Sequence, residues 1–180
     1  DRERAMRLLN GLYLQAGLAE DALRIFDRAA ATLPKDRNRY RLLAVDALIR
    51  LNRSAEAQGR NEAILKEDPN QTDALVRSAS FEIDRGQVME SIPRLERIVH
   101  LTPRNPAALF NLGRALALAG KPGLAQHWLT EAVRLAPGLI EARLELIRVL
   151  FVTDQYGEAL AKIEAALEVD PGNFEAGLMK

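Results

Sequence analysis

Five prolines recur at almost equal intervals along this chain of 180 residues. Successive prolines are 35, 34, 34 and 34 residues apart, at Pro34, Pro69, Pro103, Pro137 and Pro171. A fixed period of about 20–50 residues is typical of repeat architectures, in which each repeat buries its apolar face against its neighbours. The period therefore predicts a stack of similar units, in place of a domain built around one central core.

Other residue types keep a fixed distance from these prolines. Twelve residues before each proline lies a small side chain, namely Ala22, Ala57, Ser91, Ala125 or Ala159. Eight residues before lies Phe26, Asn61, Leu95, Leu129 or Ile163, and five before lies Ala29, Ile64, Ile98, Ala132 or Ala166. These offsets fall on one face of a helix. Each repeat should therefore end in an amphipathic helix that closes near its proline.

A third set of positions predicts a turn inside each repeat. Seventeen residues before the prolines lie Gly17, Asn52, Gly86, Gly120 and Asp154, residue types that tolerate a left-handed backbone. Apolar residues return at helical spacing upstream of this turn. We therefore expect an all-α, right-handed solenoid of five helix–turn–helix repeats, with ten helices and a truncated eleventh from Phe174. The helices should lie near 2–16, 19–32, 37–51, 54–67, 71–85, 88–101, 105–119, 122–135, 139–153 and 156–169.

Repeats two and three depart from this pattern. Asn61 occupies a position that is otherwise large and apolar, and Glu82 stands where leucine or tyrosine stands elsewhere. A buried carboxylate is costly unless it is paired. We therefore expect Phe81 to take the core position and Glu82 to reach an arginine. Pro93 is expected early in its helix, where a missing N–H costs little. These two repeats should be the least stable part of the stack.

The sequence resembles the tetratricopeptide repeat family. The fourth repeat carries the likeness best, through Leu109-Phe110-Asn111-Leu112-Gly113, Leu116, Gly120, Ala125, Leu129, Ala132 and Pro137. Repeats one and five are nearly as close. The resemblance implies one solenoid domain over 1–180, with repeats at about 3–36, 38–71, 72–105, 106–139 and 140–173, and the start of a further helix at 174–180.

Composition and motifs argue against several functions. The chain has 25 basic and 25 acidic residues, so a basic surface for nucleic acid is not expected. It has no cysteine, and its two histidines, His100 and His127, lack any neighbouring metal-ligand or catalytic motif. We expect no enzyme activity, no metal, no cofactor and no direct membrane insertion. Both bacterial cytoplasm and periplasm fit the sequence, which reads as a segment of a longer protein.

The resemblance implies a concave groove lined by the first helix of each repeat. The residues that we expect to bind a partner there are Arg4, Arg7, Leu8, Arg39, Leu42, Leu43, Asp46, Arg50, Asp73, Arg77, Phe110, Asn111, Arg114, Glu141, Glu145 and Arg148. Leu118 and Val152 map to the same face. Some family members bind carboxyl termini through a lysine–asparagine clamp. That clamp is incomplete here, because Gly11, Leu43 and Asp73 occupy three of its places.

Charge is distributed unevenly along the chain. Residues 1–60 hold 12 basic and 8 acidic side chains, and residues 140–180 hold 4 and 8. We therefore expect a protein or peptide partner with acidic groups at the N-terminal half, and self-association through the solenoid ends is a second expectation. The leading interpretation is a non-catalytic interaction module in a larger bacterial scaffold, for example in envelope assembly or exopolysaccharide export. The alternatives are a structural spacer without a groove ligand, and a regulatory domain of an enzyme or transcription regulator.

Overall fold

The computed structural model describes residues 17–169, without the side chains of 166, 168 and 169. Over this range the chain forms helices and turns and no strand, as the sequence predicted. The helices are α2 (Ala19–Thr32), α3 (Arg37–Arg50), α4 (Ser54–Glu67), α5 (Thr72–Asp84), α6 (Val88–Leu101), α7 (Pro106–Leu118), α8 (Pro122–Leu135), α9 (Ile140–Val152) and α10 (Tyr156–Val169). The helix expected near 2–16 and the one expected from Phe174 lie outside the described residues.

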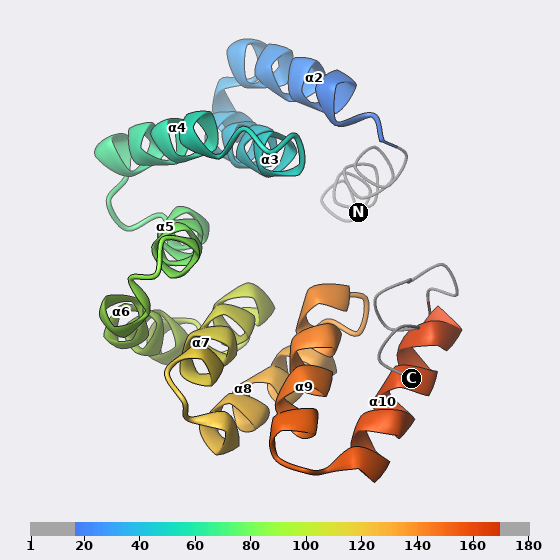
Figure 1. The fold of residues 1–180 in the computed structure, drawn as a ribbon. Coiled ribbons are helices and arrows are strands. Elements are labelled where there is room, and N and C mark those ends of the chain that lie inside the picture. Colours follow the sequence, from blue (N-terminus) through green and yellow to red (C-terminus); the bar gives the residue numbers. More distant parts are fainter. Residues whose placement is uncertain (1–16, 170–180) are drawn as a thin grey trace. The chain divides into compact units, whose positions relative to one another are not determined.

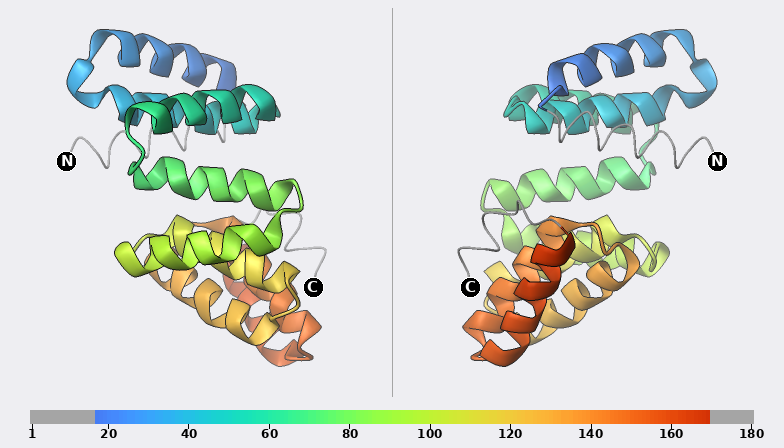
Figure 2. Two further views of the ribbon diagram at one scale, coloured as in Figure 1. Left: turned by 90° about the vertical axis from the view of Figure 1, so that its left-hand side faces the viewer. Right: turned by 90° about the vertical axis from the view of Figure 1, so that its right-hand side faces the viewer.

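The chain divides into two compact units, Asp1–Ser78 and Ala79–Lys180, called here the N-terminal and C-terminal units. In the N-terminal unit α3 packs against α2 and α4. In the C-terminal unit each of α6 to α9 packs against the next helix along the chain. Consecutive helices run antiparallel within each unit, joined by short connections (Figures 1 and 2). The helix–turn–helix organisation predicted from the period is therefore present in both units.

The turn inside each repeat has the left-handed backbone that the sequence predicted. The positive φ angles are 71° at Gly17, 56° at Asn52, 80° at Gly86, 72° at Gly120 and 58° at Asp154. At the fourth of these turns the N–H of Lys121 donates to the carbonyl of Leu116 at 2.9 Å, which satisfies a carbonyl at the end of α7. The same six-residue bond closes three other turns, at Arg53, Gln87 and Gln155.

The small residues twelve positions before each proline are all in the core. Ala22, Ala57, Ser91, Ala125 and Ala159 have no exposed surface. The hydroxyl of Ser91 remains hydrogen-bonded, because it donates to the carbonyl of Val88 at 2.8 Å. Most of the large residues four positions later are equally buried, among them Leu95, Leu129 and Ile163. The periodic positions therefore form the interior surface on which neighbouring helices meet.

Helices α7 and α8 of the fourth repeat approach each other closely at Gly113. A β-carbon on Gly113 would lie 2.6 Å from Cγ of Leu129 and 3.2 Å from the carbonyl oxygen of Ala125. These distances are shorter than van der Waals contact, so only glycine allows α7 and α8 to pack in this way. Glycine at position 113 is therefore required by the packing of α7 against α8 and not by a turn.

The unusual polar residues of repeats two and three, Asn61 and Glu82, form hydrogen bonds or ion pairs with neighbouring helices. Asn61 is 1% exposed, and its amide donates to the carbonyl of Ala74 at 2.9 Å and to Oγ of Ser78 at 3.0 Å. Phe81 is buried, and Glu82 forms an ion pair with Arg94, as predicted. Both side chains thus keep a hydrogen bond, which reduces the cost of burying them, while Asn61 Oδ1 and Glu82 Oε2 are buried without a partner.

Pro93 corrects one expectation. It is the sixth residue of α6, beyond the first turn, where a residue normally donates its N–H to the carbonyl four positions earlier. Proline cannot make that bond, and its ring also presses on the preceding turn. The backbone N–H that would bond to the carbonyl of Met89 is therefore missing. Pro93 costs the helix more stability than a proline in the first turn would, which is more than the sequence predicted.

Candidate partner-binding site

The predicted groove residues differ in how far they are exposed to solvent. Arg4, Arg7 and Leu8 lie outside the described residues. Leu42 and Asn111 are each only 5% exposed, so they pack inside the stack, and their burial corrects their placement on the groove surface. The half-buried residues are Arg39, Leu43, Asp46, Arg77, Phe110, Arg114 and Glu145, and the exposed ones are Arg50, Asp73, Glu141 and Arg148.

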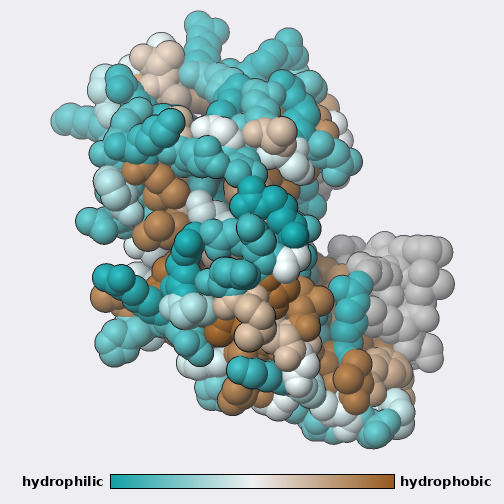
Figure 3. Space-filling view, turned by 60° about the vertical axis from the view of Figure 1, so that its left-hand side comes forward, coloured by the Kyte–Doolittle hydropathy of each residue, from teal (hydrophilic) through white to brown (hydrophobic). Residues whose placement is uncertain are grey.

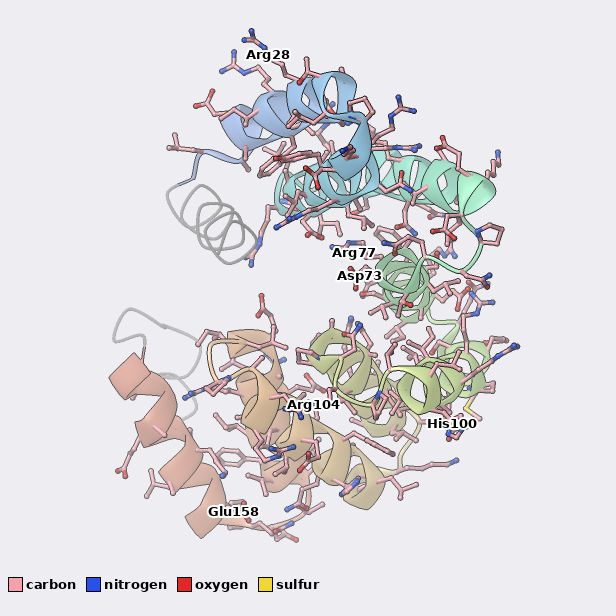
Figure 4. The ribbon with its side chains drawn as sticks, turned by 180° about the vertical axis from the view of Figure 1, so that it is seen from behind. Arg28, Asp73, Arg77, His100, Arg104 and Glu158 are labelled. Atoms are coloured by element: carbon pink, nitrogen blue, oxygen red, sulfur yellow. The ribbon has the colours of Figure 1, made fainter. Side chains whose placement is uncertain are left out.

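Arg77 is engaged within the N-terminal unit. Its Nε and Nη2 atoms donate to the two carboxylate oxygens of Asp46, each at 2.8 Å, and Nη1 donates to the carbonyl of Asp73 at 3.0 Å. Burial of Arg77 lowers its pKa, but the charge of Asp46 outweighs this effect and holds the pKa above its usual value. Figure 4 shows Asp73 and Arg77 together on α5. Arg77 therefore joins α3 to α5, which leaves it less available to a ligand than the sequence suggested.

Two further ion pairs lie on the predicted groove residues of the C-terminal unit. Arg114 of α7 donates to the carboxylate of Asp84 at the end of α5, at 2.6 Å. Arg148 contacts Glu145 on the same helix at 3.3 Å. The first pair joins two helices, and the second is a local pair on α9 whose arginine is nearly half exposed. Of the two, the Glu145–Arg148 pair is better placed to exchange partners, because exposed pairs of this kind contribute little stability.

An apolar pocket lies between the end of α7 and the facing side of α9. Its volume is about 210 Å³, and its lining residues are Ala117, Leu118, Gly120, Pro122, Glu145, Arg148, Val149 and Val152. Leu118 is 58% exposed and Val152 is 75% exposed. These two residues are 34 positions apart, so they occupy the same place in successive repeats. We call this feature the Leu118–Val152 pocket.

The sequence indicated this pocket only in part. Leu118 and Val152 map to the groove face, but the contribution of the Gly120 turn and of Pro122 depends on how α7 and α9 approach each other. The signal in the sequence is an apolar residue at the last turn of the first helix in two successive repeats. The equivalent positions of the two preceding repeats carry Arg50 and Asp84.

A second cavity lies in the N-terminal unit. It has a volume of about 230 Å³ and is lined by Asp27, Arg41, Arg60 and Ala63. Its two arginines are already paired. Arg60 contacts Asp27 at 2.6 Å and Glu56 at 2.8 Å, and Arg41 contacts Glu67 at 2.8 Å. This cavity is therefore held by internal ion pairs between helices.

Among the described residues, neither a metal-ligating cluster nor a membrane-spanning helix occurs. No group of three or more metal-ligating side chains occurs among residues 17–169. His100 and His127 are both exposed, and Figure 4 shows His100 on α6. None of the helices in this range is long and apolar enough to cross a membrane.

Figure 3 shows hydrophobic residues in clusters among hydrophilic ones on the face that it presents.

Comparison with known proteins gives the same fold. Residues 79–140 match the family model described as tetratricopeptide repeat. No curated protein matches the chain significantly.

Among solved structures, TTC0263, a tetratricopeptide repeat protein from Thermus thermophilus, is 22% identical, with 99% of this chain and 96% of that chain covered and a TM-score of 0.71. MamA from Desulfovibrio magneticus RS-1 is also 22% identical, with 96% and 97% covered and a TM-score of 0.58. The first such domain of Spaghetti (RPAP3), bound to an HSP90 peptide, is 24% identical over 62% of this chain and 88% of that one, with a TM-score of 0.57.

The match over 79–140, the positive-φ turns and the helix–turn–helix units agree with one another. The chain therefore has the fold of tetratricopeptide-repeat proteins, and its residues 79–140 match the model of that family.

Proposed function

We propose that this chain is a protein-interaction module that binds a segment of a partner protein on the face of α7 and α9, first helices of two successive repeats in the C-terminal unit. The observation that carries the proposal is the Leu118–Val152 pocket. Leu118 and Val152 expose most of their apolar surface beside a concave space of about 210 Å³. Binding sites are typically concave and largely apolar, with a few polar groups at fixed places.

This pocket favours a binding module over a spacer. Exposed leucine and valine side chains are unfavourable in water, and a spacer gains nothing from placing them together. A partner that inserts an apolar side chain removes this surface from water, which supplies binding free energy of about 25 cal/mol per Å² before the costs of association. The carboxylate of Glu145 at the same pocket can orient the bound segment.

Solved structures of the same fold support this proposal. The Spaghetti domain is described as bound to an HSP90 peptide, and YrrB, 20% identical with a TM-score of 0.58, is described as having an unusual peptide-binding site. We extend peptide binding to this chain as a proposal. We also propose that the module works within a larger scaffold, where such a groove would hold one protein against another.

The test compares two exposed leucines. Leu118→Asp places a charge in the pocket, and Leu124→Asp makes the same change on α8, where Leu124 is 55% exposed and does not line the pocket. The full-length protein and both variants are used to capture partners, and binding of the purified partner is then measured. We expect Leu118→Asp to weaken binding at least tenfold and Leu124→Asp to leave it unchanged. Equal binding by the wild type and Leu118→Asp would reject the pocket as the working surface.

A further inference from the structure

The Leu118–Val152 pocket borders an acidic part of the chain. Residues 140–180 contain four basic and eight acidic side chains. One of the basic residues, Arg143, is directed toward the backbone, because it donates to the carbonyls of Pro137 at 2.6 Å and Ala165 at 3.0 Å. The excess comes from the segment after α9, because α9 itself holds two acidic and two basic residues. At the pocket, a carboxylate attracts cationic groups of a partner and disfavours anionic ones.

Glu145 brings this charge to the wall of the pocket. It lines the cavity, and its side chain is 16% exposed. Its contact with Arg148 is 3.3 Å long, at the weak end of the hydrogen-bond range. Glu141 lies one turn earlier on α9 and is exposed. A carboxylate beside an apolar wall interacts with a cation more strongly than one in open water, because less water screens the pair.

We propose that the pocket selects a partner segment in which an apolar side chain is followed or preceded by lysine or arginine. The apolar side chain fills the space between Leu118 and Val152, and the adjacent cation pairs with Glu145. This inference rests on the proposed function and specifies the ligand of that same site. It concerns the C-terminal unit, and it differs from the acidic partner that the arginines of the N-terminal half suggest.

The first experiment identifies the preferred sequence. A library of random peptides displayed on phage is selected against the immobilised full chain, and the enriched peptides are synthesised with a fluorescent label. We expect a consensus with one apolar residue adjacent to lysine or arginine. A consensus with acidic residues beside the apolar one, or no enriched consensus, would overturn the proposal.

The second experiment separates recognition by Glu145 from simple loss of its ion pair. Glu145→Gln and Arg148→Gln both break the Glu145–Arg148 contact. Only the first removes the carboxylate that is proposed to bind the cation. Fluorescence anisotropy should show binding of the basic peptide weakened about fivefold or more by Glu145→Gln, and strengthened by Arg148→Gln, because the loss of Arg148 removes a competing cation from Glu145. If both variants weaken binding equally, the ion pair has only a structural role and the proposal fails.

A matched control tests whether the effect is local. Glu158→Gln removes one negative charge from α10, where Glu158 is exposed and does not line the pocket (Figure 4). We expect it to change affinity less than twofold, and an effect equal to that of Glu145→Gln would reject direct pairing with Glu145. Leu118→Asp separates the proposed binding function of the pocket from its proposed preference for a basic residue. If it abolishes binding while Glu145→Gln does not weaken it, the proposed function stands and the basic preference is wrong. If Leu118→Asp binds normally, both are wrong.

Discussion

Arg77 and Asp46 share two parallel hydrogen bonds of 2.8 Å, which join α5 to α3 in the N-terminal unit. Their side chains are only 21% and 30% exposed, so the pair is shielded from water more than a typical surface ion pair. Because an arginine fork matches both carboxylate oxygens, the contact fixes the direction of the two helices as well as their distance.

Asp46→Asn should therefore destabilise the chain. The change keeps the shape of the side chain but removes the charge that balances the half-buried guanidinium of Arg77. We expect the free energy of unfolding to fall by about 1–3 kcal/mol in urea denaturation. Asp73→Asn serves as the control, since Arg77 contacts Asp73 through its backbone carbonyl, which this change retains. A similar loss in both variants would mean that charge around Arg77 matters and the paired geometry does not.

Gly113→Ala should disturb the contact between α7 and α8. The added β-carbon would lie 2.6 Å from Cγ of Leu129, which is fully buried and cannot move aside freely. We expect a loss of about 1–3 kcal/mol, measured by thermal unfolding. Gly59→Ala is the matched control within α4, where nothing lies within 4 Å of the new atom, and alanine there should stabilise by up to about 1 kcal/mol. An unchanged midpoint for Gly113→Ala would show that Leu129 can repack.

Gly120→Val should destabilise the fourth repeat. Gly120 has a φ of 72°, and a β-branched side chain strongly resists this conformation although nothing lies within 4 Å of its β-carbon. We expect a cost of about 1 kcal/mol or more. Gly120→Asn should cost less, since asparagine tolerates a left-handed backbone, as Asn52 does at the equivalent turn. Equal costs for valine and asparagine would show that backbone strain is not the cause.

Ala125→Leu tests the small-residue position of the same repeat. Ala125 has no exposed surface and lies beside the Gly113 contact, so a larger side chain must push α7 and α8 apart. We expect a loss of about 1–3 kcal/mol in urea denaturation. Ala107→Leu, at an exposed position near the start of α7, should change stability by less than about 0.5 kcal/mol. Tolerance of leucine at position 125 would mean that the contact is looser than the shared small residue implies.

Arg39 and Arg50 test the separate prediction of an acidic partner at the N-terminal half. Both lie on α3, with Arg50 exposed and Arg39 half-buried. Once a partner is known, Arg39→Glu with Arg50→Glu should weaken binding of an acidic segment, and the loss should shrink as salt is raised. Circular dichroism would confirm that the helices persist. Unaltered affinity across the salt series would remove these two arginines from the binding surface.

The sequence predicted the fold to within two residues at each described helix end, because the signals were repeated. A positive-φ residue such as Gly120 and a buried small residue such as Ala125 recur at fixed distances from each proline, so each position is supported five times. Pro93 lies where the sequence placed it, six residues into the helix predicted at 88–101, but its cost was underestimated, because at that depth the missing N–H leaves a helix carbonyl without its usual donor.

The candidate site was less predictable. Arg77 and Asp46 are 31 residues apart, and the sequence does not show which of several nearby charges pair. Leu42 was placed on the groove from its position in the repeat, but packing in the N-terminal unit buries it. The Leu118–Val152 pocket depends on the separation of α7 and α9, which is set by all the side chains between them. The helices of each repeat can therefore be predicted from the sequence, whereas the contacts between repeats depend on how the side chains pack in three dimensions.

The Gly113 contact also limits how such a chain can change by recombination. The positions equivalent to Gly113 in repeats two, three and five hold Val45, Ala79 and Ile147, and those equivalent to Leu129 hold Asn61, Leu95 and Ile163. Each of these repeats thus combines side chains of different size at the place where its two helices meet. A helix exchanged between repeats would bring, for example, Ile147 against Leu129, or leave Gly113 facing Asn61. Although the repeats share one period, their helices are not interchangeable, and only an exchange of whole repeats keeps the pairing of the two helices within each repeat.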